Sequence, residues 1–457
     1  MSPVMLKKET ITLHDKLSTH LQSARKNYIA RNPESARLHE AAIEHLPGGN
    51  TRSVLHNDPF PISIKSGSGN RLTDVDGHEY LDLVSDMTAG VYGHSNPTII
   101  RTLLSTLQTT GLNLGGTSPN ELSFASAITR RIPSIHQLRF CNSGTEANLY
   151  ALSIARHVTQ RKKVVVFSGA YHGGLLTFAL GIAANTVDRE DWILARFNDA
   201  EGVRRVLRER KEEVAAVLVE GMQGAGGCIP GTAEFLHAVQ EGARENGIIF
   251  ILDEVMTFRL APGGLQSKIL HPQHGTPLTP DLTTLGKTIA GGIAIGAFGG
   301  REDLLSVYDP RTSSIQHSGT FNNNSLAMAV GCVALPEVYT PEVCIALNSL
   351  GDEFRGKLQY AVKGTKLRVT GLGAICMIHF LVDPEREIKT IEDVMVEQGS
   401  VEAGLKDLFC FYVLEKGYWL AQRGMISLPM GTTREELDGF LDIVKGFLDK
   451  YQEYIRP

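Results

Sequence analysis

Short apolar runs separated by helical segments dominate the middle of the chain. From about residue 120, such runs occupy residues 138–141, 164–167, 216–219 and 248–252, and each ends at polar or glycine residues. Segments of helical character, such as 200–213 and 233–246, lie between them. Short, mostly β-branched strands that alternate with helices are typical of a parallel sheet buried on both faces. The pattern predicts an α/β protein with an open sheet between helices.

The two ends of the chain have different patterns. Residues 10–45 have a partial helical period that is interrupted by Pro33, and residues 60–83 alternate like short strands that turn at 67–69 and 76–77. After about residue 330 we predict longer helices with strands at 367–369 and 375–380, which indicates an α+β domain. We therefore divide the chain into an N-terminal segment (1–85), a large α/β domain (86–330) and a C-terminal domain (331–457).

Composition excludes several classes of protein. The 457 residues carry a net charge of −5, without the basic block that nucleic-acid binding requires. No apolar run approaches the roughly 20 residues that span a bilayer, and the N-terminus lacks the apolar region of a secretory signal. The six cysteines are far apart and contain no CxxC pair, which argues against a metal site and a disulfide scaffold. We expect a cytoplasmic protein.

An acid and a lysine carry the sharpest chemical signal. Asp253 directly follows the apolar run 248–252, and Lys287 lies in the glycine-rich stretch TLGKTIAGG. A carboxylate at the carboxyl edge of a sheet can hold a pyridine nitrogen protonated, and a partly desolvated lysine can form a Schiff base. Both are what pyridoxal phosphate chemistry needs. A P-loop ATPase could also use Asp253-Glu254 and Gly286-Lys287-Thr288, but Asp281 stands where the phosphate loop requires glycine.

Four further motifs each have a functional and a purely structural explanation. The stretch NSGTEA (142–147) fits a phosphate cradle at a helix start, or an ordinary capping box. Tyr171, followed by His172, could stack on a heterocycle or simply pack beside a glycine turn. Glu220 and Gln223 could orient a cofactor ring or cap a loop. Gly319-Thr320 could contact a phosphate or precede a helix that we predict at 325–335.

In this order the motifs resemble the class III, or ω, aminotransferases of pyridoxal phosphate fold type I, over about residues 40–440. Within that class, DEVMTFRLAPGG and LGKTIAGG are similar to glutamate-1-semialdehyde aminomutases and to β-phenylalanine (β-amino acid) aminotransferases. The latter match better through LPGGNTRSVL, TAGVYGHS, GTFNNNSLAMA and AQRGMISLPM. The resemblance implies a mostly parallel seven-stranded sheet between helices. It also implies a smaller α+β domain that the C-terminal part forms with an N-terminal segment.

The resemblance also implies roles for individual residues. Lys287 would form the Schiff base and move the proton. The other implied cofactor contacts are Asp253 at the pyridine nitrogen, Tyr171 and Val255 on the ring faces, Ser143, Gly144 and Thr145 at the phosphate, Gln223 near the phenolic oxygen with Glu220 in support, His172 beside the ring, and Thr320 at the phosphate of the partner subunit. The last of these implies a homodimer.

The implied reaction is transfer of an amino group, by a ping-pong mechanism, from a β-amino acid or related amine to 2-oxoglutarate or pyruvate. Arg52 would bind the carboxylate of the β-amino acid and Arg423 that of the keto acid, because a planar guanidinium suits carboxylates. Met87 and Tyr92 would line the substrate pocket, and Met87 replaces an aromatic residue of the β-phenylalanine enzymes. Arg52 could instead form a structural ion pair. An aminomutase and an ω-transaminase of simple amines are the alternatives.

Overall fold

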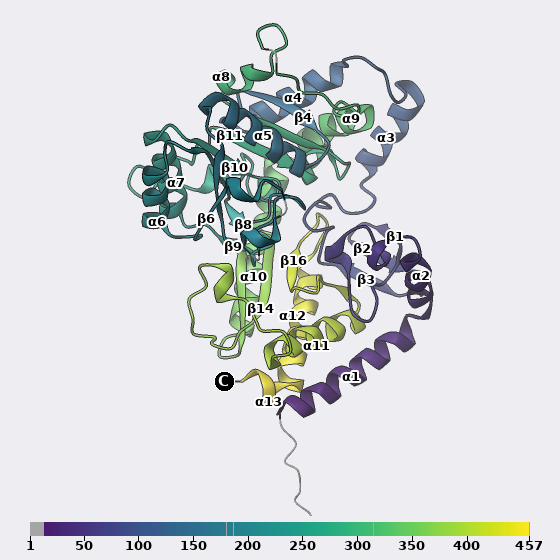
Figure 1. The fold of residues 1–457 in the computed structure, drawn as a ribbon. Helices are drawn as coiled ribbons and strands as arrows, with labels where there is room; N and C mark the ends of the chain where they lie inside the picture. The colour runs from purple at the N-terminus through teal and green to yellow at the C-terminus, as the bar shows by residue number, and fades with distance from the viewer. Residues whose placement is uncertain (1–12, 180, 186, 314, 457) are drawn as a thin grey trace, which may run out of the picture.

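The computed structural model describes residues 13–179, 181–185, 187–313 and 315–456. Figure 1 shows a large body built around one sheet and a smaller body that contains both ends of the described chain.

A seven-stranded sheet forms the centre of the large body. Its strand order is β4 (Gln137–Cys141), β12 (Gly296–Gly300), β11 (Leu282–Gly286), β10 (Ile249–Asp253), β7 (Val214–Glu220), β5 (Lys163–Phe167) and β6 (Trp192–Ala195). Only β12 runs antiparallel to its neighbours. The mostly parallel seven-stranded sheet of fold type I is thereby confirmed.

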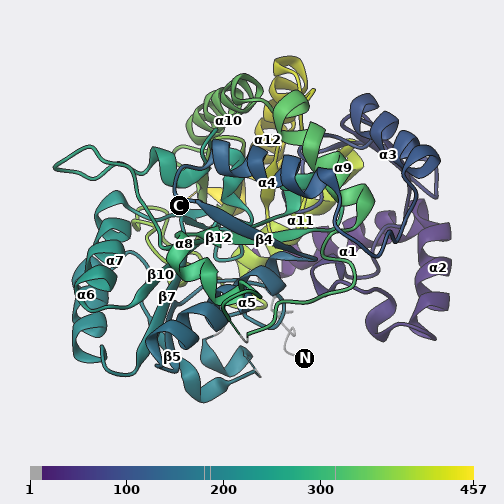
Figure 2. The same cartoon turned by 90° about the horizontal axis from the view of Figure 1, so that it is seen from above.

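Helices cover both faces of this sheet (Figure 2). On one face, α6 (Ala200–Glu209) and α7 (Ala233–Glu245) share a buried cluster with Val217 and Phe250. On the other face, α5 (Gly144–Thr159) shares a cluster with Leu218 and Ile251. Successive residues of one strand point to opposite faces, so a strand buried on both sides is apolar at every position.

The strand pattern missed β6, β11 and β12. β12 has the sequence GAFGG, which lacks β-branched residues, yet all five residues are buried. Glycine is required there because a Cβ on Gly300 would lie 2.1 Å from the carbonyl oxygen of Asp281. The close approach of two backbones, rather than side-chain packing, therefore determines this strand.

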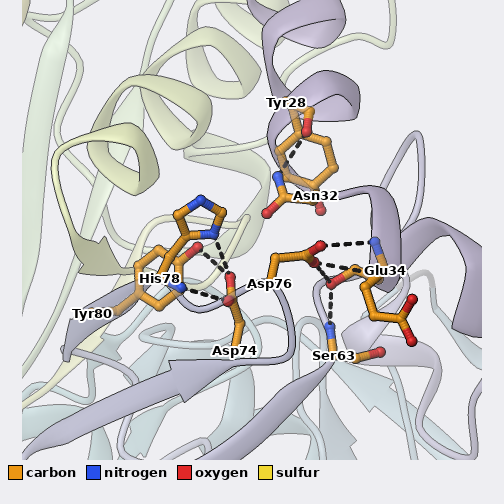
Figure 3. Close-up of polar contacts among 9 residues, drawn as sticks. Tyr28, Asn32, Glu34, Ser63, Asp74, Asp76, His78 and Tyr80 are labelled. Atoms are coloured by element: carbon orange, nitrogen blue, oxygen red, sulfur yellow. Dashed lines mark hydrogen bonds and ion pairs between the residues drawn. The ribbon is translucent and has the colours of Figure 1, made fainter.

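The N-terminal segment consists of two helices and a small meander. Helix α1 (Leu13–Arg31) is followed by α2 (Pro33–Ile43), so Pro33 begins a helix, as its fixed φ allows. Figure 3 shows how the strands β1 (Ile64–Ser68), β2 (Arg71–Asp74) and β3 (Glu79–Asp82) are tied together and to α2. The carboxylate of Asp74 accepts hydrogen bonds from His78 and Tyr80, and Asp76 accepts them from the first amides of α2.

The smaller body combines this segment with the C-terminal part. Strand β15 (Tyr418–Trp419) pairs with β3 in parallel, and α1 packs on α11 (Val401–Glu415). The remaining elements are β13 (Leu367–Leu372), β14 (Ile375–Phe380), β16 (Met425–Ser427), α10 (Pro341–Ala361), α12 (Arg434–Lys450) and α13 (Gln452–Ile455). This union agrees with the predicted α+β domain, whereas the boundaries at 85 and 330 stay predictions.

No single helix in the described ranges is long and apolar enough to cross a membrane. One pair, Ser325–Val338 and Pro341–Ala361, meets the length and composition criteria jointly but is bent by 69°. The cytoplasmic location stays a prediction.

Candidate active site

A cavity of about 630 Å³ lies at the carboxyl ends of β7, β10 and β11. Parts of the large body, the N-terminal segment and the C-terminal part all line it. Of the predicted site residues, the cavity wall contains Arg52, Met87, Gly144, Thr145, Tyr171, His172, Glu220, Asp253, Val255, Lys287 and Arg423. This is the edge at which open α/β sheets bind ligands.

Asp253 is the last residue of β10 and is buried. Its Oδ2 accepts hydrogen bonds from Nδ1 of His172 and from Nδ2 of Asn148, both at 2.8 Å. Its Oδ1 accepts one from the amide of Val255. Three donors thus surround this buried carboxylate. The site contains a carboxylate in a fixed position at the wall of the cavity.

Asn148 is a residue of the candidate site that sequence reasoning missed. It lies on the buried side of α5 and bridges three elements, because its amide donates to Asp253 and to the carbonyl of His172, while Thr284 donates to its Oδ1. The sequence did contain a signal for it, because Asn148 is a polar residue that directly follows Ala147 on the otherwise apolar face of this helix. Burial of an amide is costly unless every group finds a partner, as here.

Lys287 follows β11 directly and has a left-handed backbone, with φ of 51°. Burial lowers the pKa of its amine from 10.5 to about 8, although the carboxylates of Asp253 and Glu220 act in the opposite direction. About a tenth of such amines are uncharged at pH 7. The residue can therefore act as a nucleophile or as a proton acceptor near neutral pH.

Glu220 ends β7, beside Asp253 in the sheet register. Its Oε1 accepts a hydrogen bond from the amide of Tyr171 and its Oε2 one from the amide of Gly224. Burial raises the pKa of Glu220 to about 7, and the charge of Asp253 acts in the same direction. Glu220 thus titrates in the same range as Lys287, across one cavity.

The N-terminus of α5 opens onto the cavity. Ser143 is its N-cap, and its Oγ accepts a hydrogen bond from the amide of Glu146. The first amides of a helix have no partner within the helix, so those of Gly144 and Thr145 can bind an anion. Glycine is needed at 144, because a Cβ there would lie 2.7 Å from Val255. The capping and the cradle explanations of this motif are therefore compatible.

Tyr171 and His172 have different environments. Tyr171 is 46% exposed and lines the cavity with an aromatic ring. His172 is buried, and its Nε2 has no hydrogen-bond partner among the described residues. A buried polar atom without a partner, on a residue that lines the cavity, is consistent with a bound group that is not part of the chain.

Two arginines approach the cavity from opposite ends of the sequence. Nη1 of Arg52 lies 2.6 Å from Oδ1 of Asp86. Within the described ranges, the polar contacts of the Arg423 guanidinium are to the sulfur atoms of Met425 (3.4 Å) and Met87 (3.9 Å), and no carboxylate pairs with it. Its Nε is buried without a partner. An unpaired guanidinium at a cavity wall is a receptor for an anion.

Four predicted site residues are not part of the cavity wall; one of them, Ser143, is the N-cap of α5 and directly precedes Gly144, which does line the cavity. Tyr92 is buried in the core and donates to the carbonyl of Thr288, so the geometry does not support its substrate role and it supports the Lys287 loop instead. Gln223 is fully buried and donates to the carbonyl of Ser168. Thr320 is exposed and lies outside the cavity wall.

Together these groups form an anion cradle, an aromatic face, a fixed carboxylate and a reactive amine. Their donors and acceptors fit pyridoxal phosphate, since the cradle suits its phosphate, Asp253 suits its pyridinium, and Lys287 suits its aldehyde.

Comparisons with known proteins agree with this chemistry. The family model for class III aminotransferases matches residues 53–445. An uncharacterised aminotransferase of Schizosaccharomyces pombe is 45% identical over 441 residues, which are 96% of this chain and 98% of that protein. The β-phenylalanine transaminase of Variovorax paradoxus is 41% identical over 95% of this chain and 97% of its own.

Solved structures extend the comparison. A β-phenylalanine aminotransferase from Variovorax paradoxus superposes with a TM-score of 0.90 at 40% identity, covering 96% of this chain and 99% of that one. An ω-transaminase from Sphaerobacter thermophilus gives 0.84 at 30% identity, with 92% and 99% covered. The chain belongs to the class III aminotransferases and is a pyridoxal phosphate-dependent enzyme of that family.

Proposed function

We propose that this enzyme moves the amino group of a β-amino acid, or of a related amine, to 2-oxoglutarate or pyruvate. The observation that carries the proposal is that Arg52 and Arg423 line the same cavity as Lys287. Two cationic receptors suit two carboxylate substrates that occupy one site in turn. The likeness to a β-phenylalanine transaminase supports a β-amino acid as the donor.

The residues of the cavity would share the work as follows. The cofactor, bound covalently to Nζ of Lys287, would supply an electron sink for the carbon that bears the amino group. Asp253 would keep the pyridine nitrogen protonated, and Tyr171 and Val255 would cover the ring faces. Ser143, Gly144 and Thr145 would hold the phosphate. Once the amino group of the donor has replaced Nζ on the cofactor, the freed amine of Lys287 would remove the proton from the amino-bearing carbon and deliver it to the carbon on the other side of the donor's nitrogen.

The two arginines are expected to affect different substrates. Arg52→Ala should raise KM for β-phenylalanine, and Arg423→Ala should raise KM for 2-oxoglutarate, each by about 10- to 100-fold, because a charge-assisted hydrogen bond is lost. The measurement is a pair of steady-state KM values for each variant. Equal effects on both substrates would contradict the division of roles. Conversion of one substrate in the absence of any keto acid would instead indicate an aminomutase.

The depressed pKa of Lys287 predicts a pH dependence of cofactor uptake. Only the uncharged amine reacts with an aldehyde, so the rate at which apoprotein binds pyridoxal phosphate should rise about tenfold per pH unit and level off above about pH 8. Glu220→Gln removes a negative charge that favours the protonated amine, so the inflection should move to lower pH. Stopped-flow absorbance measures both. An inflection above pH 10 would contradict the burial argument.

We further propose that the active form is a homodimer. Exposed apolar side chains gather on α3 (Pro97–Thr109), the following loop, the start of α4 (Pro119–Arg131) and the segment that contains Thr320; they are Ile100, Leu104, Leu107, Leu112, Leu114, Leu122 and Phe321. Apolar patches of this kind mark protein interfaces. Thr320 would reach the partner's phosphate site from there.

Leu122 is 75% exposed and offers a test. Leu122→Asp should halve the mass measured by light scattering, because a charge would be buried at the interface. Val382→Asp, at another exposed apolar residue, is the control and should leave the mass unchanged. A wild-type protein that is monomeric throughout would refute the proposal.

A further inference from the structure

A left-handed turn lies beside the cavity. Residues 85–88 are Ser, Asp, Met and Thr, and their φ values are 50°, 44°, 51° and 80°. Non-glycine residues rarely adopt this conformation, and four in succession are strained. Such backbone persists only where the surroundings hold it, and it is concentrated at ligand sites.

The turn is held at both ends. Oδ1 of the buried Asp82 accepts hydrogen bonds from the amides of Val84 and Ser85. At the other end, the fully buried Arg259 donates to the carbonyl of Thr88 at 3.2 Å and to Oγ of Ser427 at 2.8 Å. The backbone from which the two side chains between these anchors project is therefore held by the fold.

Those two side chains contact the two arginines. Asp86 forms the ion pair with Arg52 at 2.6 Å, and Met87 lies 3.9 Å from Nη2 of Arg423. The turn thus places a carboxylate on one proposed substrate receptor and a neutral thioether on the other. To bind a substrate carboxylate, Arg52 would have to exchange Asp86 for it. Arg423 has no carboxylate partner within the described ranges.

We propose that Asp86 is a specificity-determining residue, because it is an internal carboxylate that competes with the substrate's carboxylate for Arg52. The proposal rests on the proposed function of Arg52. A donor with a carboxylate must displace or share Asp86 and is repelled by its charge. An amine donor without a carboxylate meets no such competition. Asp86 therefore shifts the donor preference away from β-amino acids and toward amines of lower negative charge.

The test uses two unreactive probes with the holoenzyme, 3-phenylpropanoate and its uncharged amide. Asp86→Asn keeps the turn, since asparagine tolerates the left-handed region. It should tighten binding of the propanoate by roughly three- to tenfold, somewhat above the range of a partly exposed ion pair because charge repulsion is also removed. Binding of the amide and KM for 2-oxoglutarate should not change. Calorimetry gives the dissociation constants, and the melting temperature verifies folding.

A double-mutant cycle with Arg52→Ala shows whether the effect passes through Arg52. In that background Asp86→Asn should give a clearly smaller gain, because only the direct repulsion between Asp86 and the propanoate is left to remove. Asp58→Asn, which breaks the similarly exposed ion pair with Arg25, is the matched control and should leave binding unchanged. The proposal is overturned if Asp86→Asn does not tighten propanoate binding, or if the full gain survives without Arg52. If Arg52→Ala itself leaves propanoate binding intact, the substrate role of Arg52 fails as well, which separates the two claims.

Discussion

Replacement of Lys287 by alanine is expected to abolish transamination. Loss of the proton acceptor alone should lower kcat by roughly 10²- to 10⁴-fold, and loss of the covalent attachment should lower it further. The visible absorbance of the bound cofactor should also disappear, since no other amine lines the described cavity wall. Absorbance spectra and single-turnover rates measure the two effects separately.

Two control variants make this prediction specific. Lys287→Arg retains a positive charge but cannot form the covalent bond, so it should be as inactive as the alanine variant. Lys268→Ala removes an exposed lysine that does not line the cavity, and it should have wild-type activity. An alanine variant at 287 that transaminates at the wild-type rate would contradict the assigned role.

Asp253→Asn is expected to have the second largest effect. The carboxylate would stabilise a positive charge on the pyridine nitrogen, and a neutral amide cannot do so. Removal of one preorganised electrostatic partner costs about 10²- to 10³-fold in kcat. The amide must also accept hydrogen bonds from both His172 and Asn148 at the former Oδ2 position, so weaker cofactor binding is expected too. The measurements are kcat and the dissociation constant of the cofactor.

The adjacent acid provides a contrast. Glu254 is fully buried, and it accepts hydrogen bonds from Thr257 and from the amides of Leu265 and Gln266. Glu254→Gln leaves one of these donors unpaired, so it should lower the free energy of unfolding by about 1–3 kcal/mol. It should not alter cofactor affinity. If both variants lowered kcat equally, the distinction between a catalytic and a structural acid would be wrong.

Much of the site follows from local sequence because it lies at strand ends. A buried strand is recognisable by its apolar run, and Asp253 and Glu220 each end one. Parallel strands bring their carboxyl ends to one edge, so residues far apart in sequence meet there. The apolar pattern did not reveal β11 and β12. In β11, with the sequence LTTLG, two buried threonines form hydrogen bonds with Asn148 and Gln266. In β12, with the sequence GAFGG, the close approach of neighbouring backbones determines the strand.

Side-chain orientation could not be predicted in the same way. Tyr92 stands in a motif shared with the β-amino-acid enzymes, yet its hydroxyl points to Thr288 and not to the cavity. Gln223 lies next to the cavity wall but donates to Ser168. Arg52 meets Asp86 through a left-handed turn that no propensity suggests. Such contacts depend on the packing of distant segments, which a single sequence does not disclose.

Lys287 is expected to bind the cofactor of this class III aminotransferase covalently. Reduction of the holoenzyme with borohydride, followed by peptide mass spectrometry, tests it most directly because the reagent makes the link permanent. We predict a pyridoxyl group on Lys287 alone, at about one per chain. A label on another lysine, or no label in protein that transaminates, would contradict the account.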